Sequence, residues 1–373
     1  MRKCCVWVLS VICCLSWTVN AGQVTIEIDV GYDTLTMSDA HSTIQGYLDQ
    51  YQRENPHVTI ENIGRTGNYL VRILAGEGPD IINMHQTDIR QLTIANALLQ
   101  VPTDLVADLE KEYYPVTLEG LRFQGKLWGI PTENQVSGLL YNTRLLREAG
   151  IAGPPRTWDE LRSLAPKLTI ADANGNVIRP AMVAETGTEM VVKFFHALLV
   201  GEGGALMDSA QRNFLFAEPP GPKVGEMLHE FYSVKRYVSG PWADVMRFGA
   251  GEIPLGWGWP WWAHTMPKDS LEWVDTIQVT SSPAGAAGPG DVQYGWGLVV
   301  NRNTKVEDEV WRLISWLSLR MDRGYSAYGH SLAVFGSLPN NRYDIRADFF
   351  RRDPKFTFYN AFAENMQRAV ATP

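Results

Sequence analysis

The sequence predicts an α/β protein with two domains. Its 373 residues correspond to about two domains at roughly 150 residues each. Some segments show the alternation of apolar and polar residues that is typical of strands, and others show helical periodicity. The two kinds of segment follow one another along the chain. Apolar residues make up 45% of the chain and charged residues 20%, which is enough to fill a sizeable core. This composition excludes a disordered tail, a fibrous repeat and a small disulfide scaffold.

The first predicted elements form a parallel βα unit. Apolar residues alternate with polar ones from Val24 to Val30, which predicts a strand. A helical spacing follows and ends at Asn55-Pro56, and Val58 to Ile63 predicts a second strand. The apolar face of that helix consists of Ile44, Tyr47, Leu48 and Tyr51. The order of strand, helix and strand implies that the two strands pair in parallel.

Later segments continue the alternation. Gly78-Pro79-Asp80 breaks the chain before Ile81-Ile82, a short buried strand, and a helix is predicted over about 88–99. Thr157 to Glu160 has the pattern of a capping box, in which Thr157 caps a helix and Glu160 reaches back. Residues 310–317 have one apolar helical face, and the Gly-, Pro- and Ala-rich loop 281–291 is expected to cross between domains.

The first 21 residues have the pattern of an export signal. Arg2 and Lys3 precede an apolar stretch that extends to about Trp17, and Val19 to Ala21 suits a signal peptidase, which predicts cleavage after Ala21. The stretch is too short for a comfortable membrane span. All four cysteines lie within it, so the processed chain would contain no thiol. We therefore expect a free periplasmic protein, and we consider a lipoprotein the less favoured alternative.

Charge and missing motifs exclude several classes of function. The formal net charge is −8 and the basic residues form no long run, which argues against nucleic-acid binding. The seven histidines are scattered without metal-ligand spacing. The sequence has no Walker A loop, no dinucleotide fingerprint and no G-x-S-x-G elbow. We therefore expect no cofactor, no metal and no catalytic activity.

Four tryptophans crowd the segment from Leu255 to Ala263. Glycine and proline residues between them prevent a regular helix. Because each buried indole N–H needs a hydrogen-bond partner, packing four of them into a plain core is awkward. A loop of indoles beside a cleft suits a ligand with flat apolar faces and polar edges, such as a sugar. Core packing remains the alternative for each tryptophan. The four are Trp257, Trp259, Trp261 and Trp262.

Polar residues follow two strand-like segments. Glu133 and Asn134 come after Gly129-Ile130-Pro131, and Tyr32 and Asp33 come after the first predicted strand. Side chains at the carboxyl end of a strand are well placed for ligand binding in α/β proteins. The alternative for both pairs is a solvated loop.

Five segments of the chain, taken in order, match a known pattern: Gly78 to Ile82, Phe123 to Asn142, Pro154 to Leu161, Ala250 to Trp261, and Gly295 to Val300. In these segments the chain resembles the extracellular solute-binding proteins of carbohydrate ABC transporters, the group that includes maltose-binding protein. The resemblance covers about Val24 to Leu319 and implies two α/β lobes joined by three hinge segments, with the ligand cleft between them. The implied lobes are residues 22–134 plus 283–320 and residues 135–282 plus 321–373. The chain stops earlier than the resemblance implies, which suggests truncation of the second lobe.

The resemblance also implies a set of cleft residues. Trp261 falls on a sugar-stacking aromatic, Trp259 and Trp296 would stack beside it, and carboxylates would accept hydroxyl hydrogen bonds. Loops after strands supply the other members. The candidate ligand-binding residues are Tyr32, Asp33, Gln86, Asp88, Glu133, Asn134, Glu185, Thr188, Trp259, Trp261, Trp262, Tyr294 and Trp296.

The function that this implies is a monomeric receptor that traps a sugar or oligosaccharide by hinge closure and delivers it to ABC permease subunits. A polyamine would also suit carboxylates and aromatic rings, whereas glycerol phosphate would need a cationic cluster. Two further alternatives from other classes are an exported glycosidase and a sensory binding module.

Overall fold

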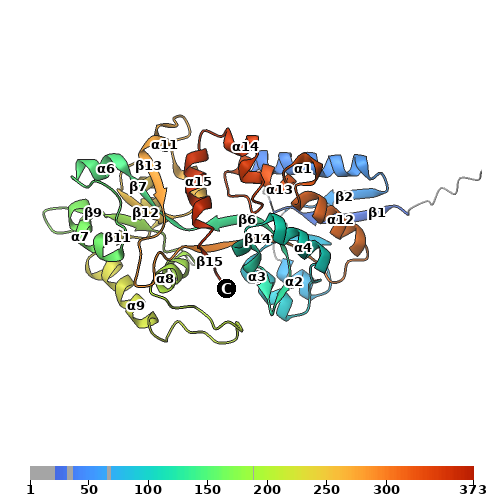
Figure 1. The fold of residues 1–373 in the computed structure, drawn as a ribbon, viewed down its shortest axis with the longest axis horizontal. Helices are drawn as coiled ribbons and strands as arrows, with labels where there is room; N and C mark the ends of the chain where they lie inside the picture. The colour runs from blue at the N-terminus through green and yellow to red at the C-terminus, as the bar shows by residue number, and fades with distance from the viewer. Residues whose placement is uncertain (1–21, 32–36, 65–68, 188) are drawn as a thin grey trace, which may run out of the picture.

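The structure is a computed structural model that describes residues 22–31, 37–64, 69–187 and 189–373. It contains two large β-sheets, each covered by helices, and two short two-stranded ribbons, and the long strands β6 and β14 lie between the two groups of elements (Figure 1). Two separate hydrophobic clusters accompany the two sheets. The predicted α/β class and the two-lobe architecture are therefore confirmed.

The first sheet has the strand order β15-β14-β3-β1-β2, with β6 beside β14. β1 pairs in parallel with β2 and β3, as the predicted βα unit requires. β14 runs antiparallel to both β3 and β6. The strands are β1 (Val24–Asp29), β2 (Val58–Asn62), β3 (Ile81–His85), β6 (Ile130–Val136), β14 (Val292–Val300) and β15 (Val370–Ala371).

Helices cover this sheet on the first lobe. The predicted helix after β1 is α1, and its buried residues include Ile44, Leu48 and Tyr51. The helix predicted over 88–99 is shorter than expected because Ala95 caps it and Asn96 adopts a positive φ of 55°. The helices are α1 (Ser38–Glu54), α2 (Tyr69–Leu74), α3 (Gln86–Ile94), α4 (Thr103–Glu112), α5 (Pro115–Glu119), α12 (Glu307–Ser318) and α13 (Ala327–Phe335).

The second sheet has the order β11-β10-β12-β7-β13. Its strands are β7 (Gly138–Asn142), β10 (Met182–Ala184), β11 (Val238–Ser239), β12 (Leu255–Gly258) and β13 (Ile277–Thr280). Its helices are α6 (Thr143–Glu148), α7 (Trp158–Leu168), α8 (Met190–Gly201), α9 (Gly221–His229), α10 (Trp242–Gly249) and α11 (Glu272–Thr276), and later α14 (Asp348–Arg351) and α15 (Phe356–Asn365). Two short ribbons pair β4 (Arg122–Phe123) with β5 (Lys126–Leu127) and β8 (Ile170–Ala171) with β9 (Val177–Arg179).

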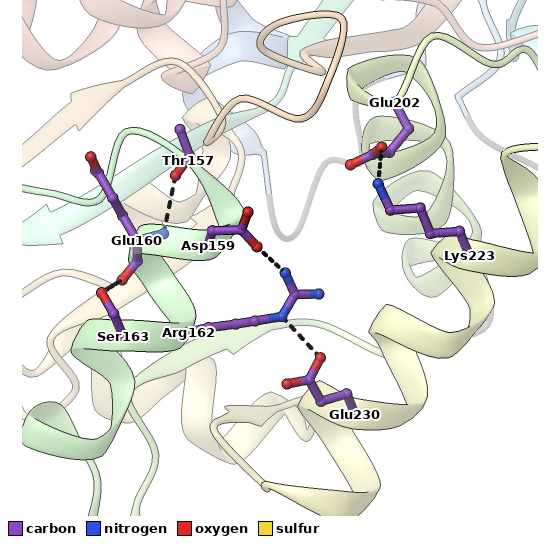
Figure 2. Close-up of polar contacts among 8 residues, drawn as sticks. All are labelled: Thr157, Asp159, Glu160, Arg162, Ser163, Glu202, Lys223 and Glu230. Carbon is purple, nitrogen blue, oxygen red and sulfur yellow. Dashed lines mark hydrogen bonds and ion pairs between the residues drawn. The ribbon is translucent and has the colours of Figure 1, made fainter.

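Side-chain caps fix the start of α7 (Figure 2). Thr157 Oγ1 accepts the N–H of Glu160 at 3.0 Å, as predicted. The Glu160 carboxylate reaches back to the N–H of Arg156, one residue earlier than a capping box places it. Arg162 then bonds both Asp159 and Glu230, which ties α7 to the segment after α9. The local sequence signal therefore predicted this helix start well.

Two neighbouring segments carry the chain between the two larger sheets, and the chain passes between the lobes again after α13. Ser137 lies between β6 and β7, and residues 281–291 lead from β13 to β14. Ser137 N donates to Val292 O, and Ser137 Oγ accepts from Val292 N, both at 2.9 Å. A Cβ at Gly138 would lie 2.9 Å from both Asn365 Nδ2 and Thr280 O, so only glycine fits there without a shift. These bonds join the two crossings into one narrow connection.

The C-terminal residues contact both lobes. α13 packs against α1 and α12, and Ala327 and Tyr328 belong to the first hydrophobic cluster. α15 packs against β13, and β15 pairs with the start of β14. α13 thus packs on the first lobe, although the predicted boundaries place residues 321–373 in the second. The exact lobe boundaries remain a prediction.

A buried carboxylate holds the start of α13. Asp344 Oδ1 accepts from Ser326 N at 2.7 Å, and Asp344 Oδ2 accepts from Ser326 Oγ at 2.6 Å. Ser326 Oγ in turn caps the helix by accepting from Gly329 N at 2.8 Å. Burial raises the pKa of Asp344 to about 7, although the bonds from Ser326 act in the opposite direction.

This raised pKa predicts a stability that falls with pH. Between about pH 4 and pH 7 the folded chain holds a proton on Asp344 that the unfolded chain has lost, so deprotonation costs folding free energy. We expect Asp344 to lower the free energy of unfolding by about 2–3 kcal/mol between pH 5 and pH 8. Asp291, whose pKa burial raises to about 6, contributes in the same direction.

Urea unfolding of the wild type and of Asp344→Asn at the two pH values measures this contribution. The variant should lose less stability over the interval because its amide does not titrate. Asp348→Asn is the matched control, since Asp348 is exposed and pairs with Arg352 on the surface. Equal pH dependence in the wild type and Asp344→Asn would contradict the prediction.

Candidate functional site

The tryptophan-rich segment divides between the core and a cavity. Trp257 Nε1 donates to Ser282 Oγ at 2.9 Å, and the indole packs edge-to-face on Trp259. Trp259 and Trp262 are 1% and 0% exposed and belong to the second hydrophobic cluster. Protein atoms already cover both rings, so this geometry gives no support to the prediction that Trp259 stacks on a ligand or that Trp262 contacts one. Gly258 leaves the space that Trp262 fills, since a Cβ there would lie 2.5 Å from that ring.

Trp261 is the exception. The strand β12 ends at Gly258, and a 3₁₀ turn begins at Pro260, so the direction of the following side chains changes. Trp261 is partly exposed and stacks on Trp242 of α10, with ring centroids 5.6 Å apart and an angle of 22° between the planes. Trp242 is 46% exposed and supports Trp261 from one side. The Trp261 side chain also lines a cavity.

That cavity has a volume of about 450 Å³ and lies between the two lobes. The first lobe contributes residues from β3, β6, β14 and α13, together with Gly31 after β1 and Met37 before α1, and the second contributes residues from α8 and the turn after β12. Its size falls within the usual range for small-molecule sites. The lining residues are Gly31, Met37, Asn83, Glu133, Met190, Trp261, His264, Tyr294, Trp296 and Phe335.

The centre of the first sheet supplies one wall. Tyr294 and Trp296 are two residues apart on β14, so they share one face of the strand. Trp296 is in register with His85 of β3 on one side and with Glu133 of β6 on the other. The β6–β14 register shifts immediately after Trp296, and such irregularities re-aim side chains near functional sites. Sheet pairing therefore assembles the aromatic and acidic residues of this wall.

Among the described residues that line this cavity, Glu133 alone has a carboxylate side chain. Its Oε1 accepts from Gln135 Nε2 at 2.8 Å and from Ser337 Oγ at 3.5 Å. These donors hold the carboxylate in place beside Trp296. A fixed carboxylate next to flat indole rings can accept hydrogen bonds from hydroxyl groups or pair with a cation.

The buried side chain of Lys193 lies against the ring of Tyr294. Lys193 Nζ lies 2.6 Å from Glu189 Oε2 and 4.0 Å from the centre of the Tyr294 ring. Burial lowers the pKa of Lys193, and the bond from Glu189 acts in the opposite direction. Burial raises the pKa of Tyr294 well above its ordinary value, while a hydrogen bond from the Trp261 indole opposes that rise. Glu189 also lies 3.9 Å from His85, so these contacts join the two lobes.

Other predicted site residues have structural roles. Both groups of the Gln86 amide are used, since Nε2 donates to Thr372 O and Oε1 accepts from Gly295 N at 2.9 Å. Asn134 is fully buried and donates to Met366 Sδ. Neither residue lines this cavity, because the amide of Gln86, at the start of α3, and that of Asn134, on β6, bond to backbone and core partners; a ligand-binding role for them stays a prediction. Asp88 lies in the first turn of α3 and does not line this cavity.

Glu185 lies just after β10 and is partly buried. Burial raises the pKa of its carboxyl, and the charge of Lys193 opposes that rise. Glu185 lies near Lys193 and does not line this cavity. The remaining predicted residues, Tyr32, Asp33 and Thr188, lie outside the described residues.

Sequence reasoning missed several lining residues. Asn83 lines the cavity and lies two residues before His85, the partner of Trp296 in the sheet, so the period of two along β3 is a signal that could have placed Asn83 on this face. Met190 begins α8 and Phe335 ends α13, and each reaches the cavity because a helix end packs between the lobes. This packing leaves no signal in the sequence, so neither residue was predictable. In the part of the chain that the structure describes, no cluster of three metal-ligating side chains occurs.

The family profile described as bacterial extracellular solute-binding protein matches residues 36–320. A probable ABC transporter-binding protein from Deinococcus radiodurans is 25% identical over 243 residues, which are 60% of this chain and 55% of that protein. A multiple sugar-binding protein from Streptococcus mutans is 23% identical over 193 residues, which are 50% of this chain and 43% of that protein. The chain thus spans about half the length of these curated relatives.

Solved structures share the fold. The sugar-binding protein MalE from Xanthomonas citri has a TM-score of 0.73 at 19% identity, with 94% of this chain and 87% of that chain covered. Maltose-bound MalE3 from T. maritima has a TM-score of 0.70 at 20% identity, with coverage of 94% and 89%. Within the described residues, none of the helices combines the length and apolarity that crossing a membrane requires. On the profile match and this two-lobe fold, the chain belongs to the bacterial extracellular solute-binding protein family.

Proposed function

We propose that this chain is the substrate-binding receptor of an ABC importer and that it traps a sugar or oligosaccharide between its lobes. It is exported through its N-terminal signal, acts in the periplasm as a monomer and delivers its ligand to the permease subunits. Relatives and structural neighbours with sugar-binding names support the ligand class. The family consists of binding proteins, which supports a role without catalysis.

The observation that carries the proposal is the composition of the interlobe cavity. Trp261 and Trp296 offer flat apolar faces from opposite lobes, and Glu133 offers a fixed hydrogen-bond acceptor beside them. A pyranose ring has apolar faces and a rim of hydroxyl groups. The indole rings can therefore cover its faces while Glu133 accepts a hydrogen bond from a hydroxyl group. Closure around the connection at Ser137 would remove both faces of the sugar from water.

A cationic ligand such as a polyamine is the second candidate. Glu133 beside Tyr294 and two indoles could also hold an ammonium group by charge pairing and cation–π contact. A glycosidase needs two carboxyl groups about 5–10 Å apart across the cleft. In the described lining of this cavity Glu133 is the single carboxylate, so this candidate has less support.

A melting-temperature screen of residues 22–373 tests the ligand class. Ligand at 1,000 times its Kd stabilises by about 4 kcal/mol, which shifts the melting temperature by roughly 2–4 °C per kcal/mol for a domain of this size. We expect a shift of several degrees with one class of sugars and none with polyamines or glycerol phosphate. A shift with polyamines alone would reject the sugar proposal.

Replacement of Trp261 tests the proposed stacking surface. Trp261→Ala should weaken sugar binding by about 1–3 kcal/mol, by analogy with aromatic stacking on nucleobases. Trp261→Phe should keep part of the affinity because a ring still covers the sugar face. Isothermal titration calorimetry with the sugar found in the screen measures both. Leu271→Ala, at an exposed position outside the cavity lining, is the control, and unchanged affinity in Trp261→Ala would remove Trp261 from the site.

Ionic strength separates a neutral ligand from a cation. For a sugar, the affinity should change little between low and high salt, and Glu133→Gln should weaken binding only by the loss of one charge-assisted hydrogen bond, about tenfold. For a cation, the affinity of the wild type should fall steeply with salt, and Glu133→Gln should abolish most of that salt dependence. Titrations at two salt concentrations with both proteins distinguish the cases.

A further inference from the structure

A second cavity lies in the same cleft. It has a volume of about 540 Å³ and shares Tyr294 with the cavity described above. His85 and Glu189 line only this second space, and their 3.9 Å contact joins the two lobes between the cavities. Tyr294 thus lies between two cavities that have different linings.

The walls of the second cavity are largely apolar and come from both lobes. The first lobe contributes Ile94 of α3 and Phe123 of β4. The loop between α8 and α9, which projects toward the first lobe in Figure 1, contributes Phe214 and Phe216. Ile94 is 68% exposed and Phe214 is 69% exposed. Exposed apolar side chains that face one another across a cavity favour an apolar occupant, because each contact removes surface from water.

The same cavity contains an arginine, Arg90, that has no acidic partner among the residues that the structure describes. The Arg90 guanidinium lies 5.5 Å from the centre of the Phe123 ring, and its Nη1 lies 3.5 Å from Met207 Sδ. Two other charged side chains of this wall pair with each other, since Lys193 Nζ lies 2.6 Å from Glu189 Oε2. Over the described residues, Arg90 makes no ion pair within 4.0 Å.

A half-buried cation among apolar groups is costly. Burial alone shifts the pKa of Arg90 downward, and no neighbouring carboxylate opposes this shift among the described residues. An arginine remains charged in proteins, so it retains a strong preference for an anion. A carboxylate can bind its guanidinium through two parallel hydrogen bonds.

We propose that this second cavity is a ligand site for small apolar carboxylates, such as arylalkanoates or short-chain alkanoates. The carboxylate pairs with Arg90, and the apolar body lies against Ile94, Phe214 and Phe216. Two features select this class together: the apolar walls exclude polar sugars, and the unpaired cation favours an acid over a neutral hydrocarbon. The site is additional to the sugar-binding cavity and does not depend on that assignment.

Calorimetric titration with 3-phenylpropanoate and its neutral amide, 3-phenylpropanamide, tests the proposal on the purified protein. The two probes have the same apolar body and differ in charge. We expect the acid to bind at least tenfold more tightly than the amide, and this difference should shrink at high salt. No binding of the acid, or equal binding of the two probes, would overturn the proposal.

Variants locate the site. Arg90→Gln should weaken binding of the acid at least tenfold and leave binding of the amide unchanged, whereas Phe216→Ser should weaken both. Arg302→Gln is the matched control, because Arg302 is an exposed arginine of the first lobe outside this cavity. Equal affinity of the acid for the wild type and Arg90→Gln would overturn the assignment, provided that the variant melts cooperatively.

The sugar cavity supplies an independent check. Trp261→Ala should leave the affinity for 3-phenylpropanoate within about twofold, because Trp261 lines only the first cavity. Loss of sugar binding with retained acid binding would separate the two sites. Loss of acid binding in Trp261→Ala would place the acid in the sugar cavity and contradict the proposal.

Discussion

The antiparallel pairing of β14 with both β3 and β6 is the constraint on which the cleft depends. It places Trp296 in register with His85 and Glu133, three residues that are far apart in the sequence. The same strand begins at Val292, which exchanges two hydrogen bonds with Ser137 where the chain crosses to the second sheet. One strand therefore carries a wall of the site and is also bonded to the connection between lobes. A shift of its register would displace the wall and the crossing together.

Periodicity predicted the fold well because each lobe obeys simple rules. The alternation from Val24 and the apolar face of α1 gave a parallel βα unit, and Thr157 capped α7 as expected. What periodicity could not supply was the path of the C-terminal residues. α13 returns to α1 of the first lobe, and this position depends on Asp344 and Ser326, whose contact joins residues outside any regular pattern. Such long-range packing leaves no periodic signal in the chain.

The site was harder to predict because residue type does not determine which way a side chain faces. Trp259 and Trp261 are two residues apart and would share a face if β12 continued, but the turn at Pro260 buries the first and exposes the second. Gln86 and Asn134 have the chemistry of a sugar site, yet their amides bond to the backbone and to a core methionine. Their burial follows from the central position of β14 and its neighbours, which sequence spacing does not reveal.

Tyr294 joins the two cavities of the cleft physically. Its ring contacts Trp259 below, with centroids 4.7 Å apart, and Lys193 Nζ lies 4.0 Å from its centre. Lys193 is almost fully buried, so its charge depends on Glu189 and on the face of this ring. Glu189 itself is exposed and contacts His85 across the cleft. Lys193 and Glu189 both belong to the second lobe, whereas Tyr294 and His85 belong to the first sheet. A motion that separates the lobes would therefore part the ammonium group from the ring and Glu189 from His85, and these two contacts favour the closed arrangement.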